Sequence, residues 1–203
     1  MRGFLDVFSL GMNSLAEELR KEGVDARAMS GPAWRAAARQ IESDFAVSAD
    51  QEPLVIVGHS YGADHAVDMA RYLQRSGIRV RLLVLLDATT PPTVPANVEQ
   101  CLHLYRPTLA GDLLPFIFAG NPVVLDRDNQ NTQLVNDIVS TEELGPKASA
   151  VNHFNIDKSE VVHAFVVKEI IEVCPPLDSA LELTNGYSPD PPTTVLEAGH
   201  ATP

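Results

Sequence analysis

The segment 53–63 constrains the fold of this chain more than any other stretch. It holds the pattern G-x-S-x-G, formed by Gly58, Ser60 and Gly62, directly after four apolar residues and directly before a helical pattern. This order predicts a strand that ends in a sharp turn and leads into a helix, with the serine hydroxyl exposed at the turn. Glycines are needed there because side chains would collide with the neighbouring backbone.

The five-residue pattern alone is short enough to arise by chance. The alternative is a glycine-rich connection between a strand and a helix that contains an incidental serine. The apolar run before the pattern and the helical pattern after it favour the serine turn.

Strands and helices of ordinary length alternate along most of the chain, which predicts an α/β fold. We expect three layers, α/β/α, around a mostly parallel sheet. The run 80–86 is apolar almost throughout, as expected of a strand that is covered on both faces. The expected helices are 13–22, 32–45, 62–75 and 157–173, and the expected strands are 24–29, 54–57, 80–86 and 98–105.

The alternation predicts a single domain over residues 1–174. Residues 175–203 are rich in proline and lack periodicity, so we expect a disordered tail. Residues 107–150 are less regular, and they are expected to form either a lid over the site or a surface insertion with one short helix.

The composition excludes several classes of partner. With 27 acidic and 15 basic residues the formal charge is −12, which disfavours nucleic acids and anionic membranes. No apolar stretch is long enough for a transmembrane helix, and no secretory signal pattern opens the chain, so a cytoplasmic location is the default. Cys101 and Cys174 are expected to be free, with one disulfide as the alternative, and neither has the spacing of a metal site.

A serine hydroxyl needs a base, and the base needs a carboxylate to orient it. In serine enzymes built on a parallel sheet the chain order is serine, acid, histidine. Asp87 directly follows the strand expected at 80–86 and fits the acid, although it could instead cap the turn before Thr89. Later alternatives for the acid are Asp112, Asp126 and Asp128.

Among the six histidines, His153 is the expected base because it lies in a loop just before the last helix. His163, inside that helix, is the alternative and is expected to be structural or at the surface. His59 is expected to point away from Ser60 and pack locally. The remaining three lie on a helix, in a strand and in the tail, and they are His65, His103 and His200.

Acyl transfer also needs donors for the oxyanion of the tetrahedral intermediate. The backbone N–H of Tyr61, the residue after the serine, is the first candidate. An early loop within residues 1–12 is expected to supply the second, from Phe4 or Leu5. The alternative for that segment is a frayed N-terminus.

From about residue 3 to residue 173 the chain resembles the α/β-hydrolase superfamily, in particular its small lipase- or thioesterase-like bacterial members. The residues that carry the resemblance are the 58–62 turn, Asp87 and the segment 153–157. The resemblance implies a Ser-His-Asp hydrolase without a metal or an organic cofactor. In two respects the chain departs from the family pattern. The acid follows an earlier strand than usual, and Met1 falls almost on the expected oxyanion loop, so that N-terminal strands, and even an export signal, could be missing.

The resulting hypothesis is a serine hydrolase that cleaves a small-molecule ester or thioester through an acyl-enzyme. An acyltransferase with the same three residues is the first alternative. The second is a non-catalytic binding or scaffold protein that keeps the hydrolase fold. The acyl-chain length, the leaving group and the oligomeric state do not follow from the sequence.

Overall fold

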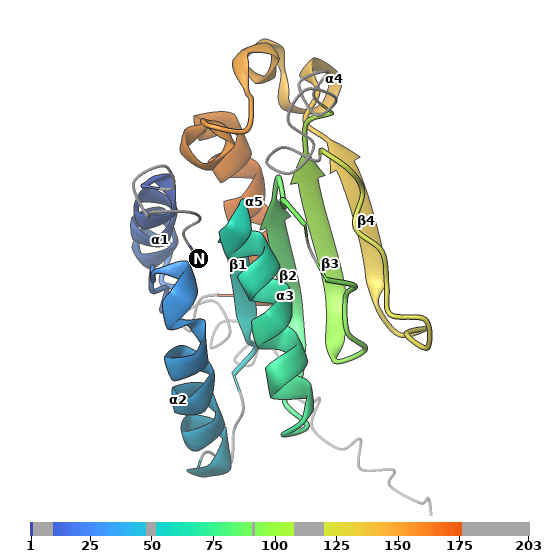
Figure 1. The fold of residues 1–203 in the computed structure, drawn as a ribbon. Helices are drawn as coiled ribbons and strands as arrows, with labels where there is room; N and C mark the ends of the chain where they lie inside the picture. Colours follow the sequence, from blue (N-terminus) through green and yellow to red (C-terminus); the bar gives the residue numbers. More distant parts are fainter. Residues whose placement is uncertain (2–9, 48–51, 91, 108–119, 176–203) are drawn as a thin grey trace, which may run out of the picture.

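The computed structural model describes residue 1 and residues 10–47, 52–90, 92–107 and 120–175 (Figure 1). The helices are α1 (Gly11–Lys21), α2 (Trp34–Val47), α3 (Tyr61–Gln74), α4 (Thr141–Leu144) and α5 (Glu160–Val173). The strands are β1 (Val55–His59), β2 (Val80–Leu86), β3 (Val98–Tyr105) and β4 (Gln133–Ile138). Short 3-10 turns lie at Gly31–Ala33, Pro146–Ala150 and Ile156–Lys158.

The four strands form one parallel sheet in the order β1-β2-β3-β4. The register pairs Val55 with Leu82 and His59 with Leu86, so β1 and β2 end at the same level. The residues that follow these two strands therefore lie side by side at the carboxyl edge of the sheet, where α/β proteins commonly place their sites.

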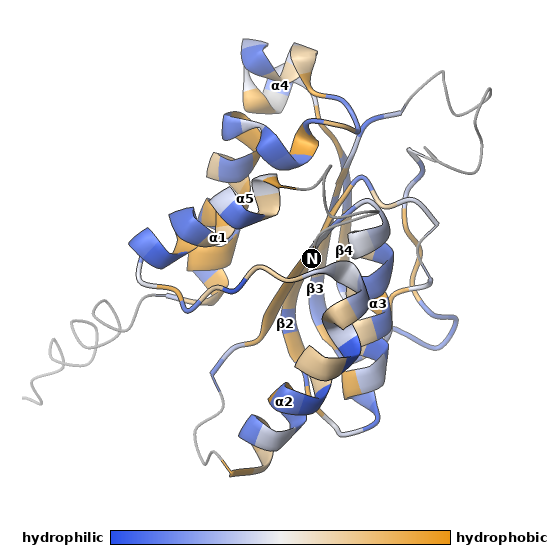
Figure 2. Cartoon of the chain, turned by 60° about the vertical axis from the view of Figure 1, so that its left-hand side comes forward, coloured by the Kyte–Doolittle hydropathy of each residue, from blue (hydrophilic) through white to orange (hydrophobic). Residues whose placement is uncertain are grey.

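Helices cover both faces of the sheet (Figures 1 and 2). The side chains of β2 alternate between two cores, which is why its sequence is apolar almost throughout. Leu83 and Leu85 pack in the core formed with α2 and α3, whereas Leu82, Val84 and Leu86 pack in the core formed with α1 and α5. The predicted three-layer α/β/α class with a mostly parallel sheet is confirmed.

The outer edge of β1 carries one further backbone pairing. The N-terminal amine of Met1 donates to the Val57 carbonyl, and the His59 N–H donates to the Met1 carbonyl at 3.1 Å. These two hydrogen bonds pair Met1 with Gly58 as in a parallel β-bridge. Within the described residues β1 is otherwise the edge strand of the sheet.

Several local predictions were wrong. Residues 24–29 alternate in polarity but form no strand. β4, inside the irregular region 107–150, was not expected, because its side chains are at most half buried and its sequence shows no apolar run. The last helix begins at Glu160 rather than 157, and Ser159 instead of Asp157 precedes it. The tail from 176 onward and residues 108–119 lie outside the described residues.

Both cysteines are free thiols, so the alternative of a disulfide is not realised. Burial raises the pKa of the Cys101 thiol to about 12, which makes it unreactive at neutral pH. No helix in the described part of the chain has the length and apolar character needed to cross a bilayer.

Candidate active site

Ser60 occupies the turn between β1 and α3. Its backbone adopts φ 56° and ψ −131°, a left-handed conformation that non-glycine residues rarely tolerate. The Ser60 N–H donates to the Leu86 carbonyl at 3.0 Å and so fastens the turn to β2. A Cβ on Gly58 would lie 2.3 Å from the Gly62 carbonyl oxygen, so only glycine fits this close approach.

Asp87 directly follows β2 and lies next to the serine turn, as the register of the two strands requires. Its N–H donates to the Leu104 carbonyl at 2.8 Å, which ties the residue to β3. The side chain is buried, and its Oδ2 lies 2.9 Å from Nδ1 of His153.

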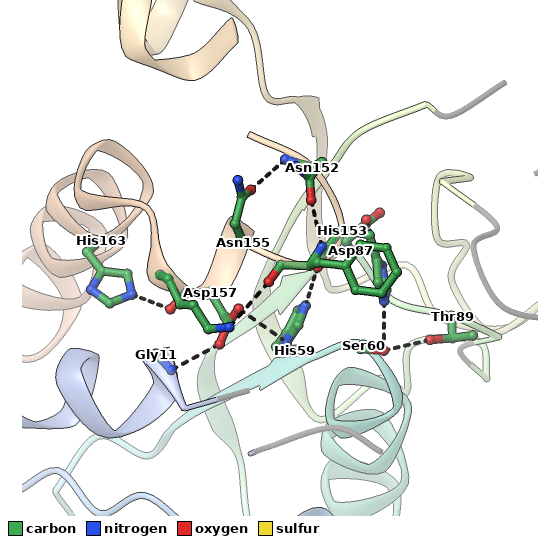
Figure 3. A network of polar contacts seen from close by, with 12 residues as sticks. Gly11, His59, Ser60, Asp87, Thr89, Asn152, His153, Asn155, Asp157 and His163 are labelled. Atoms are coloured by element: carbon green, nitrogen blue, oxygen red, sulfur yellow. Dashed lines mark hydrogen bonds and ion pairs between the residues drawn. The ribbon is translucent and has the colours of Figure 1, made fainter. Parts of the chain in front are cut away.

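His153 lies in the loop between the 3-10 turns at Pro146–Ala150 and Ile156–Lys158. Its Nε2 is 3.1 Å from Oγ of Ser60, so the three side chains contact one another in series (Figure 3). An ionised carboxylate only accepts hydrogen bonds, so the proton of a neutral His153 ring lies on Nδ1. The lone pair of Nε2 then faces the serine hydroxyl, as a base must.

Two asparagines shape the loop that carries His153. The Asn152 N–H donates to Oδ1 of Asn155 at 2.7 Å, and the Phe154 N–H donates to Oδ1 of Asn152 at 3.0 Å (Figure 3). The Asn155 amide donates to the Ala150 carbonyl at 3.0 Å. Such side-chain contacts to the backbone stabilise a turn that has no regular secondary structure.

A second polar loop reaches Ser60 from the other side. Oγ1 of Thr89 lies 3.2 Å from Oγ of Ser60, and either hydroxyl can donate (Figure 3). Asp64, in the first turn of α3, accepts hydrogen bonds from the N–H groups of Thr89 and Thr90 at 3.1 and 3.0 Å. Burial raises the pKa of Asp64, and these hydrogen bonds oppose the shift. Sequence reasoning missed this contact, although Thr89 follows Asp87 by only two residues.

Of the other acidic candidates, Asp126 and Asp128 are described, and both lie elsewhere. The Asp126 carboxylate pairs with the Arg71 guanidinium, at 2.7 and 2.9 Å, and contacts Thr93. The hydrogen bonds from Arg71 lower the pKa of Asp126. Asp112 lies outside the described residues, and Asp128 lies in a turn after Asp126.

Among the remaining predicted positions, Tyr61 is the first residue of α3, and its backbone amide adjoins Ser60. Phe4 and Leu5 lie outside the described residues. His163 is buried rather than at the surface, and its Nδ1 lies 3.1 Å from Glu18 on α1. His103 is buried in β3, and burial lowers its pKa to about 4.

The described residues contain no group of three or more His, Cys, Asp or Glu side chains that could hold a metal ion. A largely apolar cavity of about 470 Å³ lies beside β1, lined by residues of α1 and α2 such as Met12, Leu15 and Ile41. Ser60 and His153 do not line it.

Comparison with known proteins identifies a family. The Thioesterase domain family matches residues 13–186 of the 203. No curated protein matches the chain. One similar solved structure is a candidate hydrolase of the α/β superfamily from Xanthomonas campestris pv. campestris. It is 17% identical, with 84% of this chain and 95% of that chain covered, and the TM-score is 0.32.

Proposed function

We propose that this chain, which belongs to the thioesterase domain family and is a hydrolase of the ester or thioester type, acts on a small acyl substrate through Ser60, His153 and Asp87. The observation that carries the proposal is the series of contacts at the carboxyl edge of the sheet. Asp87 lies 2.9 Å from one ring nitrogen of His153, and Ser60 lies 3.1 Å from the other.

In the first half of the reaction Oγ of Ser60 attacks the acyl carbonyl carbon, and its proton passes to Nε2 of His153. The tetrahedral intermediate collapses when the bond to the leaving group breaks, and the imidazolium returns the proton to a leaving alcohol or thiol. In the second half a water molecule gives its proton to His153 and attacks the acyl-enzyme. Collapse releases the carboxylic acid and restores the Ser60 hydroxyl.

Asp87 stays ionised throughout this cycle. It keeps the proton of the resting ring on Nδ1 and stabilises the positive charge that forms on His153. Because Asp87 is buried, its charge acts on the imidazolium with little screening by water.

The negative charge on the acyl oxygen needs donors that are already in place. The backbone N–H of Tyr61 is the first donor we propose, because it belongs to the first turn of α3, where the helix dipole favours negative charge. The second proposed donor is the backbone N–H of Phe4.

The test compares Ser60→Ala with Ser76→Ala, an exposed serine beyond the far end of α3. We expect wild type and Ser76→Ala to hydrolyse short acyl thioesters or p-nitrophenyl esters with a burst of released leaving group. Ser60→Ala should retain the fold by circular dichroism and lose the burst. A folded Ser60→Ala variant that turns over at the wild-type rate would refute the proposal, and a wild-type protein with neither a burst nor turnover would favour a non-catalytic binding protein.

A further inference from the structure

A second polar cluster lies directly behind His153 and takes no part in the proton transfers above. Nε2 of His59 is 2.9 Å from the backbone carbonyl oxygen of His153, and the two rings lie 5.4 Å apart (Figure 3). Nδ1 of His59 lies 3.8 Å from Oδ1 of Asp157. His59 precedes the serine on β1, so one short segment carries both Ser60 and the side chain that contacts the His153 backbone.

The hydrogen bond to the carbonyl fixes the proton of His59. A carbonyl oxygen can only accept, so Nε2 must carry the hydrogen. The side chain is 1% exposed, and burial lowers its pKa to about 4, so the ring is neutral at physiological pH. The neutral ring has one N–H, and that N–H points at His153.

Asp157 lies on the other side of this ring. It is fully buried, and its Oδ2 accepts a hydrogen bond from the N–H of Gly11, the first residue of α1, at 3.0 Å. Burial raises the pKa of Asp157, and the nearby Lys158 charge and the hydrogen bond from Gly11 oppose the shift. The Asp157 carbonyl is also held, at 2.7 Å, by Nε2 of His163.

We propose that His59 is a positioning residue for the reaction of Ser60: its Nε2–H holds the His153 carbonyl and thereby sets where the His153 ring stands between Ser60 and Asp87. The proposal rests on the proposed function, because it assigns His153 as the base.

The position of the His153 backbone matters for the rate because the ring must contact Ser60 and Asp87 at the same time. Both of its ring contacts are near 3 Å, and the residue lies in a loop without regular secondary structure. A displacement of about 1 Å in such an arrangement can cost about 100-fold in rate. A buried histidine that merely fills space would instead affect stability and leave kcat unchanged.

Two substitutions of His59 separate these roles. In His59→Gln the side-chain amide nitrogen takes the place of Nε2 and can still donate to the His153 carbonyl. In His59→Asn the amide takes the place of Nδ1 and cannot reach that carbonyl. We expect His59→Asn to lower kcat by about 30- to 100-fold with KM little changed, and His59→Gln to stay within about five-fold of wild type.

Asn97→Ala is the control, because it removes the same kind of contact, from a side-chain N–H to backbone carbonyls, here those of Ala70 and Ile78, at a place that does not touch His153. It should lower the melting temperature and leave kcat within about three-fold. If His59→Asn does not fold, His59→Met, which fills the ring's space without a donor, is measured in its place with the same expectation.

A second readout does not depend on turnover. The proton between Nδ1 of His153 and Asp87 should give a far-downfield resonance in the proton NMR spectrum of wild type and His59→Gln, and this signal should be lost in His59→Asn. Equal kcat values for the two variants, or an unchanged resonance in His59→Asn, would overturn the positioning role. If wild type shows no turnover that depends on Ser60, the proposed function fails, and the resonance alone still decides whether His59 holds His153.

Discussion

Replacing Asp87 with asparagine tests the charge that the site places behind His153. The carboxylate oxygen lies 2.9 Å from Nδ1, so the charge centres of Asp87 and an imidazolium are about 4 Å apart. At an effective dielectric constant of about 20 their attraction is about 4 kcal/mol. Since 1.36 kcal/mol is a factor of ten in rate, loss of the charge alone predicts a fall in kcat of about 10³-fold.

The asparagine amide also favours the wrong tautomer of His153. With an N–H donor facing Nδ1, the ring proton moves to Nε2, which can then no longer accept the proton of Ser60. Losses of this kind in other enzymes reach about 10⁴-fold. We therefore expect Asp87→Asn to lower kcat by about 10³- to 10⁴-fold.

The assay is steady-state hydrolysis of an acyl thioester, with Asp126→Asn as the matched control. Asp126 pairs with Arg71 and lies outside the site, so its variant should hydrolyse within about two-fold of wild type. A folded Asp87→Asn protein that keeps more than about a tenth of wild-type kcat would refute the role assigned to Asp87.

Two further predictions concern stability. Gly58→Ala should unfold the serine turn or lower the melting temperature by many degrees, because its Cβ would lie 2.3 Å from the Gly62 carbonyl oxygen; a calorimetric melting temperature equal to wild type would contradict this close approach. Asp126→Asn should lower the melting temperature most near pH 7 and progressively less as the pH falls below about 4. The Arg71 hydrogen bonds lower the pKa of Asp126 below its unfolded value of 3.8, so the stability they contribute is present above that value and is lost as the pH falls through the lowered pKa. A difference in melting temperature that grows as the solution is acidified would contradict this linkage.

The positions of Ser60 and Asp87 could be predicted from the apolar runs in the sequence and from the geometry of a parallel sheet. The apolar runs that became β1 and β2 are each buried by helices on both faces, so their sequences identify them without knowledge of the rest of the chain. Their parallel pairing then places Ser60 and Asp87 side by side. His153 was selected by its place before the last helix, and the structure brings its ring between the other two side chains.

Other features depend on contacts between distant parts of the chain. Asp157 has capping-box spacing with Glu160, yet its carboxylate accepts from Gly11, which is 146 residues away. His59 contacts a backbone carbonyl 94 residues later. No local spacing indicates either contact. β4 was missed for a different reason, because a strand at the edge of a sheet is half exposed and needs no apolar run.

The most direct test of the central claim is to locate the covalent adduct. Wild-type protein treated with a fluorophosphonate should gain the mass of one probe, and digestion followed by mass spectrometry should place the label on Ser60. Ser60→Ala should gain no mass under the same conditions. A label on any other residue of the wild-type protein, or an undiminished mass increase in Ser60→Ala, would contradict the assignment of Ser60 as the nucleophile.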